Sequence, residues 1–430
     1  MVTVSLLGRL AAGGLRVGRH RATTAHLCSA YPFLAEAGIG GTGAYMGVDV
    51  RAGSSSFEWD AFDAYGAHAV TNPNVLIAGE PGVGKSATTK CLLYRACGVF
   101  DRWPAIVDPK GEYGPLADAL GLAVIELHPG GSTRINPLEP GPAAATDGPG
   151  ELGRRQATML AALLGSVLRR DLSPAEDAAV GWATVQLARA EKPVPTLADL
   201  ARLLADPSAE MAERARTTPA ELARRVEAVS FALSKLLDRS LRGMFDGPTT
   251  VTSASLDKGV VIDLSAVHHD PEALALVMVA ATAWLQALIT QPGPHRIQIL
   301  DEAWCLLGAE RTSRYLQACW KLGRAHGVAN VAVVHRLSDL RSQADDGTAT
   351  AKVSMGLLAD TQTRILFRQS SDQVVDARSL LGLSEMESWI VSRLCRGRAL
   401  WKIGDHSTVV QHIIGSAERA FCDTDARMAV

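Results

Sequence analysis

Residues 79–86 read Gly79-Glu-Pro-Gly-Val-Gly-Lys-Ser86 and fit the pattern GxxxxGK[ST] without a mismatch. An apolar segment, 74–78, precedes this stretch and a helical pattern, 87–97, follows it, which is the context that the pattern requires. The glycines allow backbone angles that turn successive N–H groups inward, and the start of the next helix adds a field that favours anions. The stretch therefore predicts a phosphate-binding loop between a strand and a helix.

The loop residues have separate expected roles. Lys85 should reach the β- and γ-phosphates of a bound nucleotide, and the Ser86 hydroxyl should ligate Mg²⁺. We therefore predict that ATP and Mg²⁺ are bound here. The predicted nucleotide-binding residues are Gly79, Glu80, Pro81, Gly82, Val83, Gly84, Lys85, Ser86 and Ala87.

Short, almost uncharged runs rich in β-branched residues alternate with helical patterns on both sides of this loop. The predicted strands are 75–78, 105–107, 260–264, 297–300, 331–334 and 365–367. Runs of this kind are typical of parallel strands that are covered on both faces. The predicted fold is α/β, a P-loop NTPase (RecA-like) doubly wound parallel sheet.

One long segment interrupts the alternation. Glu139–Gly150 is rich in Pro, Gly and Ala and predicts a linker, and residues 151–241 contain only helical patterns. Ser173-Pro-Ala-Glu176 and Thr218-Pro-Ala-Glu221 each place a capping hydroxyl first, proline next and glutamate three residues on, which marks a helix start. We expect an all-helical subdomain inserted into the sheet domain.

The predicted organisation follows from these boundaries. An N-terminal segment (1–70) leads into the first part of the ATPase core (71–138), and the linker and helical insertion occupy 139–241. The second part of the core (242–415) ends in a predicted edge hairpin at 397–414, and a tail (416–430) follows.

A predicted strand ends in two carboxylates, Asp301 and Glu302. At the carboxyl edge of the sheet, beside the phosphate-binding loop, Asp301 is expected to hold Mg²⁺ through water. Glu302 is then placed to orient and polarise the attacking water as a general base. An Asp-Glu pair at a strand end is common, and its combination with the loop favours a hydrolytic site.

Other polar groups are expected near the sheet edges. Asp108-Pro-Lys-Gly-Glu-Tyr113 follows the second predicted strand, although its composition fits a simple turn equally well. His335 and Arg336 end a predicted strand that Arg324 precedes, while Arg364 and Arg368 flank another. Such cations stabilise a γ-phosphate in their own or a neighbouring subunit, or else lie solvated on the surface.

From these groups, we predict a catalytic set of Lys85, Asp301, Glu302, His335, Arg324 and Arg368.

Composition limits the classes of protein. Hydrophobic residues make up 47% and charged residues 20%, as in a folded globular chain. The net charge of −2 neither supports nor excludes DNA as a partner. Seven scattered cysteines without a CxxC pair favour reduced thiols in a cytosolic compartment. The segment 1–21 lacks the pattern of a signal peptide, and the apolar run 274–290 predicts a core helix better than a membrane span.

Taken in order, the motifs resemble the HerA/FtsK superfamily of ring ATPases, and more specifically the conjugation ATPases of type IV secretion systems (the VirB-four and TraC group). The resemblance spans about residues 23–414. Besides the loop and the Asp108–Tyr113 motif, it is carried by Tyr31-Pro-Phe33, Gly47-Val-Asp49, Asn72-Pro-Asn74, Met244-Phe-Asp-Gly-Pro248, Val261-Ile-Asp-Leu264, Leu300-Asp-Glu-Ala-Trp304 and Leu381-Gly-Leu-Ser384.

The resemblance implies a homo-hexameric ring with ATP at the subunit boundaries, docked on secretion-channel proteins at the inner membrane. The implied substrate is DNA or a nucleoprotein, and the implied location is cytoplasmic or peripheral at the inner face of the cell membrane. The sequence departs from the family in three ways. His335 stands where a glutamine is usual, the family's long N-terminal domain does not precede the motifs, and the charge is not that of an obvious DNA pump.

The first functional hypothesis is an ATP-hydrolysing motor of a conjugative or type IV secretion apparatus. The alternatives are an FtsK/HerA-like translocase that acts directly on DNA, and a scaffold that binds ATP without hydrolysing it. A P-loop kinase is a weaker alternative, since no acceptor pocket is recognisable.

Overall fold

The computed structural model describes residues 41–139, 149–189, 194–289, 293–307, 310–335, 356 and 360–422. Several sequence features lie outside these described residues: Tyr31–Phe33, Arg336 and most of the predicted linker.

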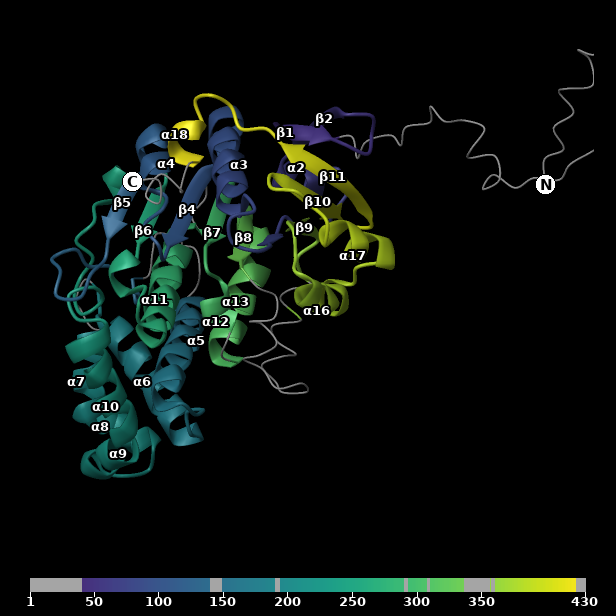
Figure 1. The fold of residues 1–430 in the computed structure, drawn as a ribbon. Coiled ribbons are helices and arrows are strands. Elements are labelled where there is room, and N and C mark those ends of the chain that lie inside the picture. Colours follow the sequence, from purple (N-terminus) through teal and green to yellow (C-terminus); the bar gives the residue numbers. More distant parts are fainter. Residues whose placement is uncertain are drawn as a thin grey trace, which may run out of the picture.

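The described residues form an 11-stranded sheet (Figure 1). Its strands are β1 (Ala44–Asp49), β2 (Ser55–Trp59), β3 (Val75–Ala78), β4 (Trp103–Asp108), β5 (Ala123–Glu126), β6 (Val260–Asp263), β7 (Arg296–Leu300), β8 (Val328–Val334), β9 (Thr363–Leu366), β10 (Arg398–Ile403) and β11 (His406–His412). Their order is β2-β1-β11-β10-β9-β3-β8-β7-β4-β6-β5. Pairing is parallel from β9 through to β5 and antiparallel from β9 outward to β2. The six predicted strands and the mostly parallel α/β fold are confirmed.

The sheet extends further at both ends than the sequence predicted. β5 adds a parallel strand beyond β6, and only Ile125 is buried in it, so it lacks the apolar run that marks the other parallel strands. The predicted edge hairpin, β10–β11, is not at the edge. β1 pairs with β11 and β2 pairs with β1, so the N-terminal segment supplies the outer strands.

Helices cover both faces of the sheet. The α-helices are α2 (Ala61–Gly66), α3 (Lys85–Phe100), α4 (Gly114–Leu120), α5 (Pro149–Leu168), α6 (Pro174–Arg189), α7 (Leu197–Ala205), α8 (Ala209–Arg214), α9 (Pro219–Arg225), α10 (Glu227–Lys235), α11 (Pro271–Ile289), α12 (Trp304–Leu307), α13 (Glu310–Gly323), α16 (Ser371–Leu381), α17 (Glu385–Val391) and α18 (Arg419–Cys422). Short 3₁₀ turns occur at η4 (Ser253–Leu256), η5 (Ser265–Val267) and η6 (Arg324–His326), and a π-turn at η3 (Leu236–Ser240).

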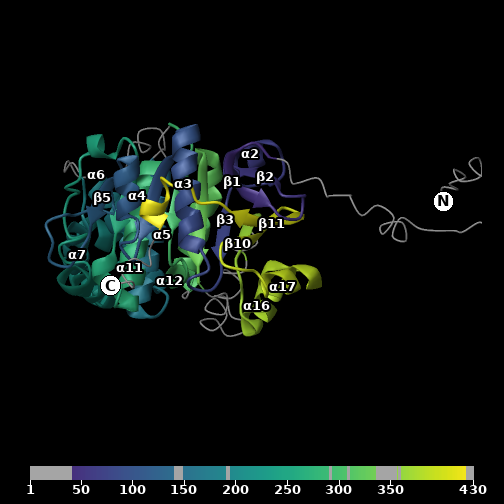
Figure 2. The same ribbon diagram turned by 45° about the horizontal axis from the view of Figure 1, so that its top comes forward.

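Alternate residues of the strands pack into two separate hydrophobic cores, one on each face of the sheet. Val75 and Ile77 pack in the core that contains α3, α4 and α18, whereas Leu76 and Ala78 pack in the core that contains α5, α11 and α13. Figure 2 shows α3 and α4 together on the first of these faces. A strand whose successive side chains are all buried must be covered on both sides, as the sequence predicted.

The apolar helix α11 belongs to the second core. Among the described residues it is the one helix long and apolar enough to cross a membrane, yet 83% of its apolar window is buried inside the fold. It packs against α5 and β4. The prediction of a core helix is confirmed.

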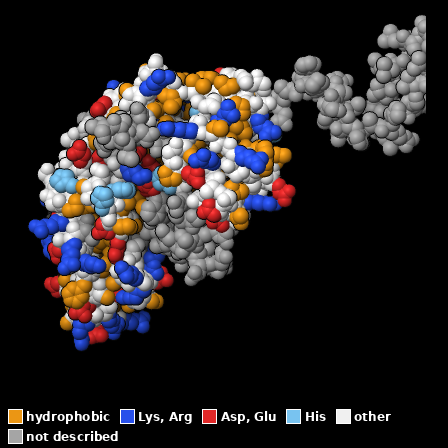
Figure 3. Space-filling model, viewed as in Figure 1, with side chains coloured by type: hydrophobic (Ala, Val, Ile, Leu, Met, Phe, Trp, Pro, Cys, Tyr) orange, Lys and Arg blue, Asp and Glu red, His pale blue; other side chains and the backbone are white. Residues whose placement is uncertain are grey.

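The helical insertion, α5 to α10, extends from one end of the sheet (Figure 1). The Ser173 cap is formed as predicted, because the Glu176 N–H donates to Ser173 Oγ at 3.3 Å and the Ser173 N–H donates to Glu176 Oε2 at 2.7 Å. At Thr218 only half of the box forms, since the Glu221 carboxylate pairs with nearby arginines. Figure 3 shows basic and acidic side chains interspersed over this insertion.

We predict that Glu176→Gln destabilises the fold in a pH-dependent way. Hydrogen bonds from Arg170 hold the carboxylate at 2.7 Å from each side, and they lower the pKa of Glu176 to about 2 against the opposing effect of burial. The folded pKa is below the ordinary value, so the stabilisation is present above pH 4.5 and is lost as the pH falls toward 2. Because the Arg170 side chain is nearly half exposed, solvent screens the pair and the loss at pH 7 should be small but measurable.

Urea denaturation of both proteins at pH 7 and near pH 3.5 measures this difference. The control is Glu210→Gln, which breaks a solvent-exposed pair with Arg214 and should change stability little. Equal effects of the two substitutions would contradict the assigned role of Glu176.

Candidate active site

The phosphate-binding loop connects β3 to α3. Gly82 and Gly84 have φ angles of +75° and +112°, which only glycine adopts readily. Gly79 is needed for a different reason, since a Cβ at this position would lie 2.5 Å from the Cβ of Phe367. Three glycines are therefore required by local geometry, and they shape the main chain between the strand and the helix.

Helix α3 begins with its amino end open toward this loop. Gly84 is the N-cap and no side chain caps the helix. Lys85 is buried, and its ammonium group donates to the carbonyl oxygens of Gly79 at 2.6 Å and Glu80 at 2.7 Å. Burial lowers the pKa of Lys85 to about 8, and Asp301 is the strongest opposing charge. A cation and uncapped N–H groups thus converge at one point, which suits a phosphate.

The strand register explains why the distant motifs meet. Ala78 at the end of β3 is in register with Val334 of β8, Ala332 of β8 with Leu300 of β7, and Leu300 with Val107 of β4. The residues that follow these strands therefore share one edge of the sheet. Asp301 and Glu302 were expected beside the loop. They share its edge of the sheet, but β8 lies between β7, which they follow, and β3, which the loop follows.

Glu302 forms a compact cluster with two basic groups. His335 Nε2 lies 2.6 Å from Glu302 Oε1, and Lys110 Nζ contacts the same oxygen. Lys110 Nζ is also 2.8 Å from His335 Nε2. Burial alone would raise the pKa of Glu302, but His335 and Lys110 lower it to about 2. Glu302 is therefore a paired carboxylate in this arrangement, on a backbone with φ of +52° that is unusual for a side chain of this size.

Asp301 is buried next to this cluster. Its Oδ1 accepts a hydrogen bond from the Glu302 N–H at 2.9 Å, and its Oδ2 accepts one from the Tyr113 hydroxyl at 3.3 Å. Burial and the charge of Glu302 raise the pKa of Asp301. A carboxylate in this position is stabilised by an added cation.

The segment Asp108–Tyr113 contacts both carboxylates, Asp301 and Glu302. Asp108 accepts hydrogen bonds from the Lys110 N–H at 3.1 Å and from the Tyr113 N–H at 2.8 Å, which makes the turn expected from the composition. The same turn directs Lys110 to Glu302 and Tyr113 to Asp301. The sequence indicated the motif but not these two roles, because the partners belong to a strand that is almost 200 residues away.

The predicted arginines are divided between the two ends of the sheet. Arg368 lies at the loop, where its Nε donates to Glu80 Oε2 at 3.1 Å. Arg324 precedes β8 and therefore lies at the opposite edge, with Nη1 3.5 Å from the carbonyl oxygen of Thr71. Arg364 bonds to the carbonyl oxygens of Thr361 and Leu381. Within one chain, only Arg368 of these three borders the site.

A cavity of about 630 Å³ opens beside the first turns of α3. It is lined by residues of α3, of the β10–β11 hairpin and of the C-terminal segment: Gly84, Ala87, Thr88, Cys91, Arg95, Arg396, Gly397, Gln411, His412, Ile413, Ile414, Arg419 and Cys422, together with Met46 of β1. Gly84 belongs both to the phosphate-binding loop and to the lining, so the cavity adjoins the loop. Of these residues the sequence had indicated only Gly84 and Ala87, because the others come from segments far apart in the chain.

The residues also fit Mg²⁺. In the part of the chain that the structure describes, no three His, Cys, Asp or Glu side chains form a metal cage. Mg²⁺ in nucleotide sites commonly takes only one or two protein ligands and completes its shell with phosphate oxygens and water. The Ser86 hydroxyl and the buried Asp301 carboxylate are of the required chemical type.

We predict that Gly79→Ala weakens nucleotide binding by roughly tenfold or more, because the added Cβ displaces either the loop or Phe367. The matched control is Gly98→Ala on α3, where an added Cβ has no atom within 4 Å. The control should leave affinity unchanged and raise the free energy of unfolding by about 0.5–1 kcal/mol. Titration with a fluorescent ATP analogue and urea denaturation measure both effects. Full affinity in Gly79→Ala would contradict the assigned loop geometry.

Comparison with known proteins gives a fold-level match. No protein-family model and no curated protein sequence match this chain. Among solved structures, VirB4 of Thermoanaerobacter pseudethanolicus is similar over 89% of this chain and 99% of its own, with a TM-score of 0.69 and 21% identity. The plasmid coupling protein TrwB in complex with ADP and Mg²⁺ is similar over 80% of this chain and 86% of its own, with a TM-score of 0.54 and 16% identity.

TrwB in complex with the non-hydrolysable GTP analogue GDPNP gives a TM-score of 0.55 at 17% identity. Identities this low establish a shared fold and leave activity to be argued from the residues. The resemblance expected from the motifs is confirmed at that level: this chain has the α/β P-loop fold of VirB4 and of the coupling protein TrwB.

Proposed function

We propose that this protein is an ATP-hydrolysing motor of a conjugative or type IV secretion apparatus. The observation that carries the proposal is the electrostatic site at one sheet edge. A buried lysine in a glycine-shaped loop lies close enough to two buried carboxylates for them to influence its pKa. Phosphoryl transfer depends on this kind of positioned charge.

Each residue of the site has a role in the proposed reaction. The loop N–H groups and Lys85 bind the phosphates, and Ser86 and Asp301 hold Mg²⁺. When bound, Mg²⁺ neutralises the negative charge that develops on the phosphate oxygens. Glu302 orients the attacking water and accepts its proton. Arg368, which pairs with Glu80 of the loop, contributes positive charge in this proposal once it is released from Glu80.

The basic partners of Glu302 add a requirement to this mechanism. One oxygen of the carboxylate is shared by Lys110 and His335, so its basicity is suppressed. His335 Nε2 either donates to Glu302 or accepts from Lys110, because one ring nitrogen cannot do both at once. We infer that the cluster must rearrange before Glu302 acts as a base, and that His335 takes part in place of the glutamine usual in the family.

We also propose the cellular process and the partners of this motor. Support for the secretion role comes from the shared fold with VirB4 and with TrwB, which is a conjugative coupling protein. We propose a homo-hexamer that works on secretion-channel proteins from the cytoplasmic face of the inner membrane and moves DNA or a nucleoprotein. The alternative of direct action on DNA gains no support from the comparisons, and adding duplex DNA to the hydrolysis assay tests it.

We predict that Glu302→Gln lowers the rate of ATP hydrolysis by about 100-fold or more while nucleotide binding is retained, since the amide cannot accept the proton. Lys85→Ala should lower nucleotide affinity as well as rate, because it removes the buried cation of the loop. Phosphate release at saturating Mg²⁺–ATP and equilibrium nucleotide binding separate the two effects.

The matched control is Glu126→Gln, at the exposed end of β5, which should hydrolyse ATP like the wild type. An equal, negligible rate in wild type and Glu302→Gln, with tight ATP binding in both, would instead indicate a scaffold that binds ATP without hydrolysis.

We further predict that Lys110→Met raises the basal hydrolysis rate, by roughly 3- to 10-fold, because Glu302 regains basicity when one of its two cations is lost. Lys321→Met on α13 removes a comparable charge from an exposed site and serves as the control. Steady-state rates of both variants test the prediction. A fall of the Lys110→Met rate to that of Glu302→Gln would show that Lys110 assists the reaction and does not restrain the base.

A further inference from the structure

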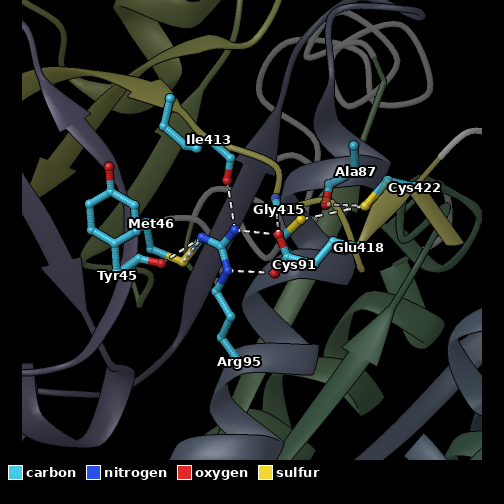
Figure 4. Close-up of polar contacts among 9 residues, drawn as sticks. All are labelled: Tyr45, Met46, Ala87, Cys91, Arg95, Ile413, Gly415, Glu418 and Cys422. Atoms are coloured by element: carbon cyan, nitrogen blue, oxygen red, sulfur yellow. Dashed lines mark hydrogen bonds and ion pairs between the residues drawn. The ribbon is translucent and has the colours of Figure 1, made fainter. Parts of the chain in front are cut away.

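Two cysteines that are 331 residues apart meet between helix α3 and the C-terminal segment. Cys91 Sγ lies 3.4 Å from Cys422 Sγ, and both side chains are buried (Figure 4). Cys91 belongs to the second turn of the helix that follows the phosphate-binding loop, and Cys422 ends α18. The proposed hydrolysis mechanism uses neither thiol.

A network of charged and polar contacts holds the two segments together. The Arg95 guanidinium bonds both carboxylate oxygens of Glu418, at 2.6 and 2.5 Å, and also donates to the carbonyl oxygens of Tyr45 and Ile413 (Figure 4). Lys90 Nζ donates to the carbonyl oxygen of Phe421 at 3.0 Å. These contacts fix the backbone that leads into Cys422, so the approach of the two sulfur atoms is built into the packing.

The thiols are accessible from one direction. Cys91 and Cys422 both line the cavity of about 630 Å³ beside α3, through which a small oxidant can reach them. The thiols also differ in character. The hydrogen bond between the two thiols lowers the pKa of Cys422, assisted by the charges of Lys90 and Arg95, whereas the same bond and burial raise the pKa of Cys91. Cys422 is therefore the better nucleophile of the pair.

We propose that Cys91 and Cys422 are a reversible redox modification site, at which a hydroperoxide forms a disulfide that tethers the C-terminal segment to helix α3. The Cys422 thiolate attacks the terminal peroxide oxygen, the O–O bond breaks, and a sulfenic acid forms as hydroxide leaves and takes up a proton. The Cys91 thiol then attacks that sulfur, loses its proton, and expels the sulfenic oxygen as water. Two thiols are oxidised and one hydrogen peroxide is reduced to two waters.

The tether would fix one wall of the cavity. Cys422 Sγ already lies 3.7 Å from the carbonyl oxygen of Ala87, in the first turn of α3. Once Cys422 is bonded to Cys91, the wall formed by Arg419 and Cys422 cannot move away from the helix. This inference concerns thiol chemistry alone and stands whether or not the chain hydrolyses ATP.

The test treats the reduced, folded full chain with a small molar excess of hydrogen peroxide. The remaining thiols are then alkylated under denaturing conditions. We expect the intact mass before alkylation to fall by two hydrogen atoms, two fewer thiols to be alkylated, and a linked Cys91–Cys422 peptide pair after digestion. Dithiothreitol should reverse all three changes. The oxidised wild type should also melt a few degrees higher than the reduced form, because the cross-link restricts the unfolded chain.

Matched variants locate the reaction. Cys91→Ser and Cys422→Ser should lose the cross-link, and Cys91→Ser should stop at a sulfenic acid that a dimedone probe captures on Cys422. Cys395→Ser, at an exposed position, and Cys305→Ser, at a buried one, should keep the cross-link. Peptide mapping of the wild type gives the result even if a serine variant fails to fold. A cross-link between other cysteines, or full alkylation of Cys91 and Cys422 after oxidation, would overturn the proposal.

Discussion

The site depends on the balance of buried charge at the carboxyl ends of four adjacent parallel strands. Lys85, Asp301 and Glu302 are all almost fully removed from solvent, and each would be costly to bury alone. They are tolerated because they face one another and Lys110 across the same sheet edge. A nucleotide with its metal would bring further charges of both signs to this edge, close to Lys85, Asp301 and Glu302.

The rigid sheet makes that balance possible. Backbone pairing from β3 through β8 and β7 to β4 fixes the positions of four chain segments that are widely separated in sequence. Asn74, at the start of β3, strengthens this frame, since its side chain accepts hydrogen bonds from both the main chain and the side chain of Asn330 on β8. The groups that must move during a reaction, Lys110 and His335, are by contrast partly exposed.

Much of this site was predicted from local sequence, and the features that were not predicted were missed for physical reasons. The loop, the parallel strands and the acidic pair each have a short local pattern, set by backbone geometry or by burial on two faces. The structure contains the strands, and it brings the loop and the acidic pair to one edge of the sheet, as expected. The position of β8 between β3 and β7 has no local signature, because strand order depends on how helices pack. For the same reason the ion pair of Lys110 with Glu302 was not predicted. Arg324 was expected to serve a γ-phosphate of its own or of a neighbouring subunit, and within its own chain it lies at the opposite end of β8 from the site. β1 and β2 were missed because outer antiparallel strands, with one exposed face, carry less apolar sequence.

The most direct test of the central claim is a structure of the protein with Mg²⁺ and a non-hydrolysable ATP analogue. The account predicts that the phosphates lie against the main chain of residues 82–86, and that Lys85 Nζ has left the carbonyl oxygens of Gly79 and Glu80 for a phosphate oxygen. It also predicts that Asp301 faces the metal. A nucleotide bound elsewhere, or a Lys85 that keeps its bonds to those two carbonyl groups while the analogue is bound, would contradict it.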